Sequence, residues 1–138
     1  MRTFIRRMVG AALLRRDTYE EVEADRSANR QALAVVLLAS LGTGIGWVGV
    51  ESGQLGAIAV LSTVRVGFWM AWALLTFLIG SRLLPEAQTR ADPGELLRTL
   101  GFAQSPAVLR ALGAIGGLGP AVMVITVLWT LATMVVAV

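Results

Sequence analysis

Long apolar stretches without charge dominate the chain after its first thirty positions. There are three such stretches: Gln31–Val50, Val66–Ser81 and Ala111–Val138. A helix needs about 20 apolar residues to cross roughly 30 Å of hydrocarbon, and only helices and closed barrels satisfy their backbone in lipid. The pattern therefore predicts an all-α integral membrane protein. The composition agrees, with 56% apolar residues and a mean hydropathy of +0.71.

Within this class we expect about four hydrophobic segments, three or four of which span the membrane. They lie near residues 31–50, 66–84, 96–115 and 120–138. The second segment can also be extended back to Ala57. Arg65 would then lie roughly 12 Å inside the helix and would have to snorkel or find a partner.

The third segment contains the clearest local signals. Asp92-Pro93-Gly94-Glu95 predicts a helix start, with an N-cap carboxylate and proline at the first helical position. Pro106 lacks a backbone N–H, so we expect the helix to end near Ala103 and to break at a hinge. The segment is then either kinked or re-entrant. The hinge residues are Gly101, Gln104 and Pro106, with Gln104 and Ser105 placed to satisfy the freed Phe102 carbonyl.

We expect residues 1–30 to form a charged cytoplasmic segment, which we call the apron, and residues 31–138 to form a single helical membrane domain. All 12 basic residues are arginines, and the net charge is only +3, which does not indicate nucleic-acid binding. Seven arginines lie in the apron and three in the connection from Arg82 to Arg98, while the loop between the first two spans holds only Arg65. This distribution predicts a cytoplasmic N-terminus.

Residues 1–14 are too short and too polar to span, and they predict an amphipathic helix at the membrane surface. One face is expected to be apolar and the other basic. The apolar face would hold Phe4, Ile5, Met8, Val9 and Ala12, and the opposite face Arg2, Thr3, Arg6, Arg7 and Gly10. The alternative is that this helix packs on another protein. After it, Asp17 is expected to cap a short acidic turn and Ser27 to start the next helix.

Catalytic chemistry finds little support. The chain has no cysteine and no histidine, so we predict no catalytic residues, no cofactor and no metal site. Gly44-Ile45-Gly46-Trp47-Val48-Gly49 matches a dinucleotide-binding pattern, but it lies inside a span and lacks the preceding strand. Gly42 and Gly46, or Gly113 and Gly117, have instead the spacing of close helix packing, although a flexible turn is preferred for the second pair.

Five arginines are candidate contacts to lipid or to a partner: Arg2, Arg6, Arg7, Arg65 and Arg110. Arg110 is notable because an ionisable residue inside an apolar segment indicates a site. Trp69 and Trp72 share a helix face, for which core packing is the favoured interpretation.

The motif Gly101-Phe102-Ala103-Gln104-Ser105-Pro106 resembles the start of the third segment in the bacterial form of the Yip1-domain family. An acidic stretch before the first span, Asp17–Val22, a glycine-rich turn and Trp129 in the last span extend the resemblance. It implies the fold and the membrane location, whereas the GTPase binding of eukaryotic members does not carry over. Relatives usually continue with a polar segment, so either a tail follows Val138 or the last helix ends bluntly.

Three functions are compatible with these observations. The leading hypothesis is a non-enzymatic, Yip1-like membrane protein of a bacterial-type inner membrane that organises lipid or partner proteins. The alternative is an accessory transmembrane subunit of a larger membrane complex, such as a respiratory or photosynthetic assembly. The third is a small oligomeric transporter or channel with Arg65, Gln104 and Arg110 as its polar pathway. The expected partners are membrane lipid and either other transmembrane proteins or further copies of the chain.

Overall fold

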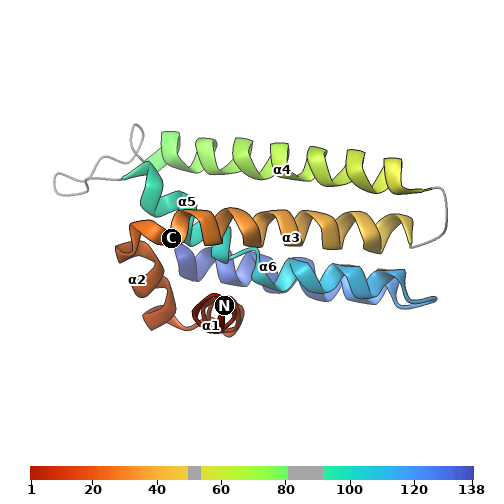
Figure 1. Ribbon diagram of the computed structural model, residues 1–138, viewed down its shortest axis with the longest axis horizontal. Helices are drawn as coiled ribbons and strands as arrows, with labels where there is room; N and C mark the ends of the chain where they lie inside the picture. The colour runs from red at the N-terminus through yellow and green to blue at the C-terminus, as the bar shows by residue number, and fades with distance from the viewer. Residues whose placement is uncertain (50–53, 81–91) are drawn as a thin grey trace.

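The computed structural model describes residues 1–49, 54–80 and 92–138, and within these ranges it contains helices and no strand. Figure 1 shows three long helices that extend along the length of the molecule, with short helices gathered at one end. In chain order the elements are α1 (Arg2–Ala12), α2 (Arg16–Ala24), the 3-10 helix η1 (Arg26–Ala28), α3 (Asn29–Val48), α4 (Leu55–Leu78), α5 (Pro93–Phe102), the 3-10 helix η3 (Ser105–Ala114) and α6 (Gly119–Ala137).

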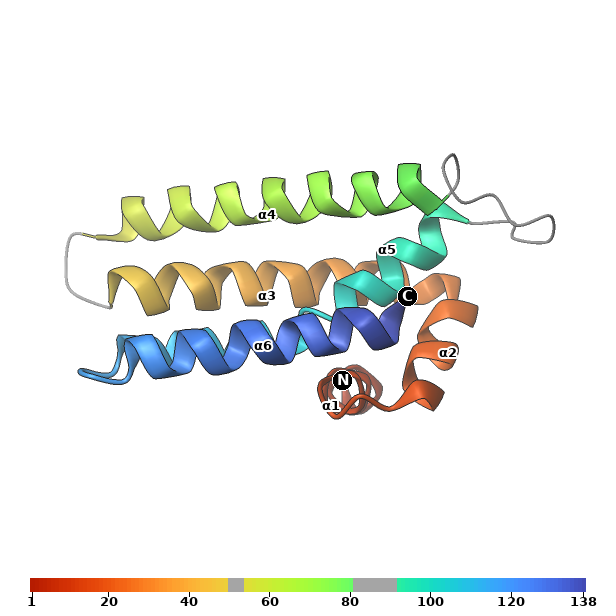
Figure 2. The ribbon, with the colours of Figure 1, turned by 180° about the vertical axis from the view of Figure 1, so that it is seen from behind.

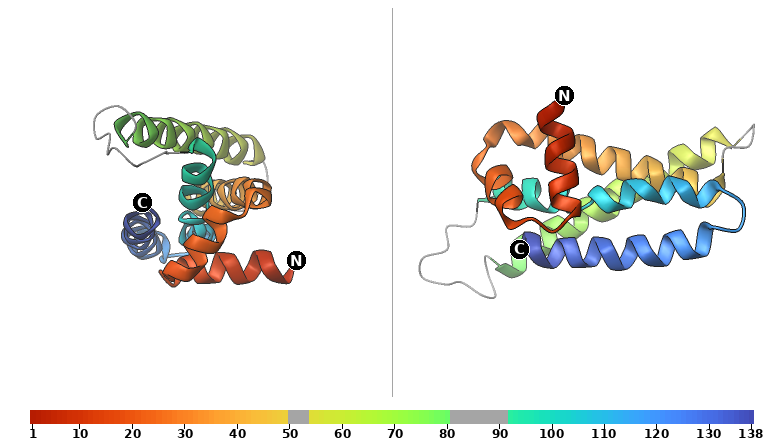
Figure 3. Two further views of the ribbon diagram at one scale, coloured as in Figure 1. Left: turned by 90° about the vertical axis from the view of Figure 1, so that its left-hand side faces the viewer. Right: turned by 90° about the horizontal axis from the view of Figure 1, so that it is seen from below.

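The three long helices confirm the predicted class. Arg26–Val48, Leu55–Leu78 and Gly119–Ala137 are each long and apolar enough to cross a membrane. In Figures 1 and 2 all three extend along the length of the molecule, and Figure 3 shows that α4 is inclined to α3 and α6. The protein is therefore an all-α membrane protein with about three spans.

The second span begins earlier than the predicted range of 66–84. Helix α4 starts at Leu55 and ends at Leu78, so the extended alternative holds and a start near residue 66 is wrong. Its 24 residues correspond to a length of about 36 Å. The helix continues through Arg65 because this side chain finds a hydrogen-bond partner inside the protein, at Gln104. The last four predicted residues, 81–84, lie outside the described part of the chain.

The predicted break in the third segment is confirmed. Helix α5 ends at Phe102, and a ten-residue 3-10 helix follows from Ser105, although 3-10 runs longer than four residues are uncommon. Figures 1 and 3 show α5 lying obliquely at one end of the bundle and η3 continuing beside α3 to the other end. Helix α6 then returns, so the C-terminus lies at the same end as α2.

The predicted helix start at Asp92 is also confirmed, because its carboxylate accepts a 3.0 Å hydrogen bond from the Gly94 N–H. The two helix starts that were predicted in the apron differ from the observed ones. Helix α2 begins at Arg16 without a side-chain cap, and Asp17 lies in its first turn. Asp25 instead caps η1, because its carboxylate accepts a hydrogen bond from the Ser27 N–H. Ser27 itself lies within η1, before α3 begins.

A core of buried hydrophobic residues lies where the apron meets the membrane helices. It is formed by Ala11, Tyr19, Val22, Ala28, Ala32, Val35, Phe102 and Ala103. A Cβ atom at Gly101 would lie 2.8 Å from the Cβ atom of Ala32, so the absence of a side chain at Gly101 lets α5 approach α3 closely. Residues 1–30 therefore pack as a continuous part of the helical membrane unit.

Helix α1 lies across the direction of the spans. Figure 1 shows it end-on, while α3, α4 and α6 run across the page. Its faces differ from the predicted ones. Phe4 packs inward against the Phe102 ring, with 6.5 Å between the centroids, whereas Ile5 and Val9 are about half exposed. Arg7, expected on the outer face, is buried, because carboxylates of the apron neutralise its charge.

Candidate functional site

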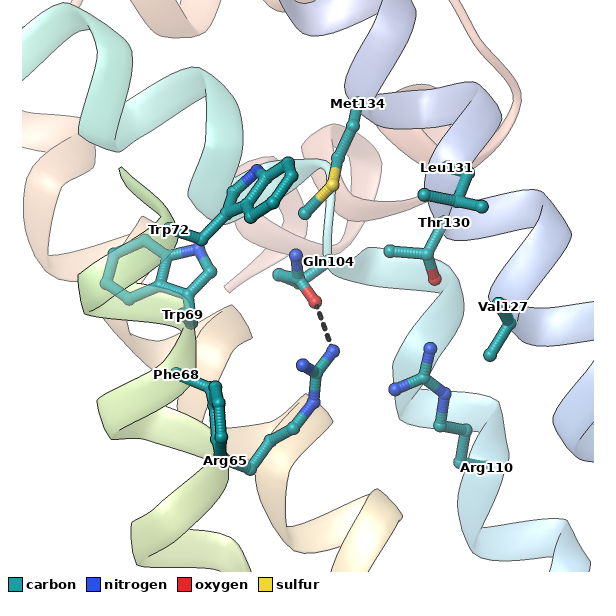
Figure 4. A pocket seen from close by; sticks show the side chains of 10 residues that line it. All are labelled: Arg65, Phe68, Trp69, Trp72, Gln104, Arg110, Val127, Thr130, Leu131 and Met134. Carbon is teal, nitrogen blue, oxygen red and sulfur yellow. Dashed lines mark hydrogen bonds between the residues drawn. The ribbon is translucent and has the colours of Figure 1, made fainter. Parts of the chain in front are cut away.

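A cleft between α4 and α6 brings together the two arginines that the sequence places inside apolar segments. Its volume is about 360 Å³. Figure 4 shows the Arg65 and Arg110 side chains on opposite sides of the cleft, with both guanidinium groups pointing into it. The lining side chains are Arg65, Phe68, Trp69, Trp72, Gln104, Arg110, Val127, Thr130, Leu131 and Met134.

Arg65 lies near the middle of α4, ten residues or about 15 Å from its first residue. Its Nη2 donates a 3.1 Å hydrogen bond to Oε1 of Gln104, which is 98% buried at the junction of α5 and η3. Gln104 therefore bonds the arginine and lies at the break between the two helices. The Phe102 carbonyl is bonded by Ser105, which leaves the Gln104 amide free for this role.

Arg110 is buried in η3, and hydroxyl groups of two other helices hold it. Its Nε donates to Oγ1 of Thr126 at 3.3 Å, and its Nη1 lies 3.5 Å from Oγ1 of Thr43. Both hydrogen bonds are long, and both acceptors are uncharged hydroxyl groups. Thr126 in turn donates to the backbone carbonyl of Val122, so its hydroxyl is oriented by α6 itself.

Close approach of η3 to α3 sets the position of Arg110. A Cβ atom at Gly42 would lie 2.6 Å from the carbonyl oxygen of Val108, and one at Gly46 would overlap the carbonyl of Arg110. The predicted packing role of Gly42 and Gly46 is thus confirmed. The two glycines of the second pair have different roles. Gly113 packs near the Gly46 backbone, whereas Gly117 has a φ of +82° and lies in the turn before α6.

Neither cleft arginine forms a salt bridge with a carboxylate in residues 1–49, 54–80 or 92–138. The salt bridges of these ranges join Arg6 and Arg7 to Glu21 and Asp25. Two guanidinium groups directed into one cleft create a positive potential there, and low-polarity walls strengthen it. The arrangement is suited to an anion.

Trp69 adds a donor that the sequence does not reveal. The side chain is 93% buried, and its indole N–H has no hydrogen-bond partner in the described part of the protein. In Figure 4 the nitrogen-bearing ring faces the cleft and the six-membered ring points away from it. Core packing thus describes Trp69 only in part, and Trp72 on the same face is 53% exposed.

The apron arginines divide into two groups. Arg2 is exposed, and the Arg6 side chain is 64% exposed beside Glu21, so both remain candidate lipid contacts. Arg7 instead connects α1 to α2 and α3 inside the protein. It donates to Glu21 at 3.0 Å, to Gln31 at 3.1 Å and to Asp25 at 2.7 Å. The predicted outward role of Arg7 is therefore corrected to an internal one.

Hydrogen bonding to this network shifts the pKa values of two carboxyl groups. Hydrogen bonds from Ser27, and then from Arg7, lower the pKa of Asp25 to about 2. The pKa of Glu21 is also lowered, mainly by its hydrogen bond from Arg6. Burial raises the pKa of Tyr19, whose hydroxyl donates to the Ala11 carbonyl at 3.1 Å.

Arg98 is a second internal tether, which sequence reasoning does not identify. It is 98% buried, and it donates to the carbonyl groups of Val22 and Glu23 at 3.1 and 2.5 Å. These carbonyls belong to the last turn of α2, where backbone acceptors lack helical partners and a cation is favourable. A third bond joins it to the Asn29 side chain at 3.2 Å.

The fold and the cleft define a multi-pass, all-α membrane protein with a cleft rich in hydrogen-bond donors between α4 and α6. Comparisons with protein-family models, with curated proteins and with solved structures gave no match. Among the described residues, no three or more His, Cys, Asp or Glu side chains form a group that could hold a metal ion. The side chains that line the cleft are suited to binding an acceptor.

Proposed function

We propose that this protein is a non-enzymatic membrane protein that organises lipid at the bilayer surface beside α1. The observation that carries the proposal is the outward face of this helix. Ile5, Val9 and Leu13 follow one another at intervals of four residues and are each about half exposed. Arg2 and Arg6 lie next to this stripe and are also exposed. An apolar stripe flanked by arginines is typical of helices that lie in the interface of an anionic membrane.

The attachment of α1 to the spans supports this role. The Trp129 indole on α6 donates a 2.7 Å hydrogen bond to the Ala12 carbonyl at the end of α1. Arg7 ties the same helix to α2 and to Gln31 of α3. An interfacial helix fixed to the spans at two points holds its lipid contacts at a defined depth, which a freely hinged helix would not do.

The test is the lipid exposure of α1 in the full-length protein. Because the chain has no cysteine, a single cysteine can be introduced at Val9 or, as control, at the exposed Glu20 of α2. With a fluorophore attached and nitroxide-labelled lipid in nanodiscs, the Val9 position should be quenched strongly and the Glu20 position weakly. Equal, weak quenching would mean that α1 faces water or a partner, and would refute the proposal. A stoichiometric partner chain after purification in mild detergent would favour the accessory-subunit alternative.

The orientation that goes with this function is an N-terminus in the cytoplasm of a bacterial-type cell. The arginine distribution supports it. In Figure 1 the turn before α6 lies at the end opposite to α1 and α2. A cysteine at Gly116, in this turn, should be labelled from outside intact cells, and one at Glu20 should be labelled only after lysis. The reverse pattern would invert the orientation.

A further inference from the structure

We infer that the cleft between α4 and α6 binds the phosphate group of an anionic phospholipid. Arg65 and Arg110 would provide the charge, and the Trp69 indole would provide a neutral donor. This site goes beyond the proposed role of α1, because it uses different residues on different helices.

Hydrogen-bond donors outnumber acceptors in this cleft. Each guanidinium has five N–H donors. The described contacts use one donor of Arg65 and two donors of Arg110. The Oε1 atom of Gln104 already accepts from Arg65, and the Thr130 hydroxyl donates to the Thr126 carbonyl at 2.6 Å. A phosphate group brings several acceptor oxygens, and the planar fork of arginine suits them in pairs.

Trp69 is an independent indication that an acceptor is missing. Buried side-chain donors in folded proteins nearly always have a partner, so a buried indole N–H without one calls for a specific reason. Trp69 lies on the cleft wall in the turn after Arg65. A ligand oxygen held by the two arginines would supply the acceptor that this indole lacks.

The surroundings of the cleft favour a lipid over a soluble anion. Phe68 and Leu131 line it on α4 and α6, and they are 68% and 53% exposed on helices long enough to cross a bilayer. The site is therefore open to hydrocarbon. A volume of about 360 Å³ accommodates a headgroup, whereas two acyl chains would have to lie outside it, along the apolar helices. Basic pockets between transmembrane helices are typical sites for anionic headgroups.

The depth of the cleft is compatible with a headgroup. It extends from the two arginines towards Met134 (Figure 4), which lies three residues or about 5 Å before the end of α6. This is the end of the bundle at which α1 and α2 lie. Two arginines that extend towards the interface can draw a phosphate inward with local thinning of the bilayer.

Native mass spectrometry of the full-length protein tests the site. We expect phosphatidylglycerol to be retained more tightly than phosphatidylcholine with the same acyl chains. Loss of a charge-assisted contact corresponds to at least about a tenfold loss of affinity, so Arg65→Gln and Arg110→Gln should each show this loss. Arg26→Gln is the matched control, since it removes the same charge from an exposed residue outside the cleft and should bind like the wild type. Equal loss in all three variants would indicate general surface attraction and would overturn the inference.

Trp69→Phe separates binding from folding, in case an arginine variant fails to fold. It removes a donor that has no protein acceptor, which offsets the packing lost with the smaller ring, so the melting temperature of the lipid-free protein should change little. Its affinity for phosphatidylglycerol should decrease by about two- to tenfold, the value of one hydrogen bond. Unchanged affinity would remove Trp69 from the site, and unchanged affinity in the arginine variants as well would overturn the inference.

Two further results would assign the cleft to another occupant. Displacement of the lipid by glycerol 3-phosphate at millimolar concentration would identify a soluble phosphate site. A co-purified transmembrane chain in place of lipid would indicate that a partner protein occupies the cleft, and would overturn the inference. The quenching of a Val9 label, which tests α1, should be the same in Arg65→Gln as in the wild type, so the failure of one idea is distinguishable from that of the other.

Discussion

The hydroxyl of Ser105 donates a 2.6 Å hydrogen bond to the carbonyl oxygen of Phe102. In a continuous helix this carbonyl would accept from the N–H of residue 106, which is a proline and has none. The next carbonyl, that of Ala103, accepts at 2.7 Å from the Thr133 hydroxyl on α6. Two side chains thus replace backbone hydrogen bonds at the break, and the change from α5 to η3 carries no unpaired carbonyl at either position.

The first prediction concerns this replacement. Ser105→Ala should lower the free energy of unfolding by about 1–3 kcal/mol, since it leaves the Phe102 carbonyl buried without a partner. Titration with a denaturing detergent in mixed micelles measures the change. Thr63→Ala is the control, because its hydroxyl bonds the Ala59 carbonyl on an exposed face of α4, and it should change the value by less than about 0.5 kcal/mol. Similar values for both variants would argue against a structural role for the Ser105 bond.

Helix packing at Gly46 leads to the second prediction. Gly46→Ala would place a methyl group on the Arg110 carbonyl, so η3 would have to move away from α3. We expect a loss of about 1–3 kcal/mol, the usual cost of overpacking, and weaker binding in the cleft. Gly67→Ala makes the same change in α4, where no atom lies within 4 Å of the new Cβ, and should stabilise the protein by about 0.5–1 kcal/mol. Opposite signs in the same unfolding assay would support close packing, and equal signs would contradict it.

Local chemistry made part of the fold predictable. The hydrophobic pattern locates the spans, and Asp92, Pro93 and Pro106 set the ends of α5, because each acts on the backbone within a few residues of itself. The spacing of Gly42 and Gly46 likewise indicates close packing without identifying the partner.

The positions of the arginines were harder to predict, because they depend on distant partners. Arg98 bonds carbonyls 76 and 75 positions away, and Arg65 bonds Gln104, which is 39 positions away. A helical wheel places Arg7 outside, since it contains no information on Glu21 or Asp25. For the same reason, the shared cleft of Arg65 and Arg110 becomes visible only when α4, η3 and α6 are seen together (Figure 4).

The third prediction compares two neighbouring arginines that share one carboxylate. Arg7 and Arg6 both bond Glu21, but the Arg7 side chain is 6% exposed and that of Arg6 is 64% exposed. Arg7→Gln should release α1 and raise the rate of proteolysis between α1 and α3 by about tenfold or more, because charge-assisted bonds are lost inside the protein. Arg6→Gln should change this rate by less than about fivefold, as expected for an exposed pair. Equal rates in the two variants would mean that Arg7 does not hold the apron.

The fourth prediction is a pH dependence of the docking of α1. Asp25 has a pKa of about 2 in the folded protein, against an ordinary value of 3.8, because Ser27 and then Arg7 hydrogen-bond its ionised form. Its contribution to stability is therefore fully present above pH 3.8 and is lost as the pH falls towards 2. The ¹⁹F NMR signal of 5-fluorotryptophan at Trp129 can report this loss, since the Trp129 indole donates to the Ala12 carbonyl. We expect the signal of the wild type to change between pH 4 and pH 2. Asp25→Asn should show the altered signal already at pH 7 and a smaller change in acid, whereas identical pH profiles would exclude Asp25 as the responsible group.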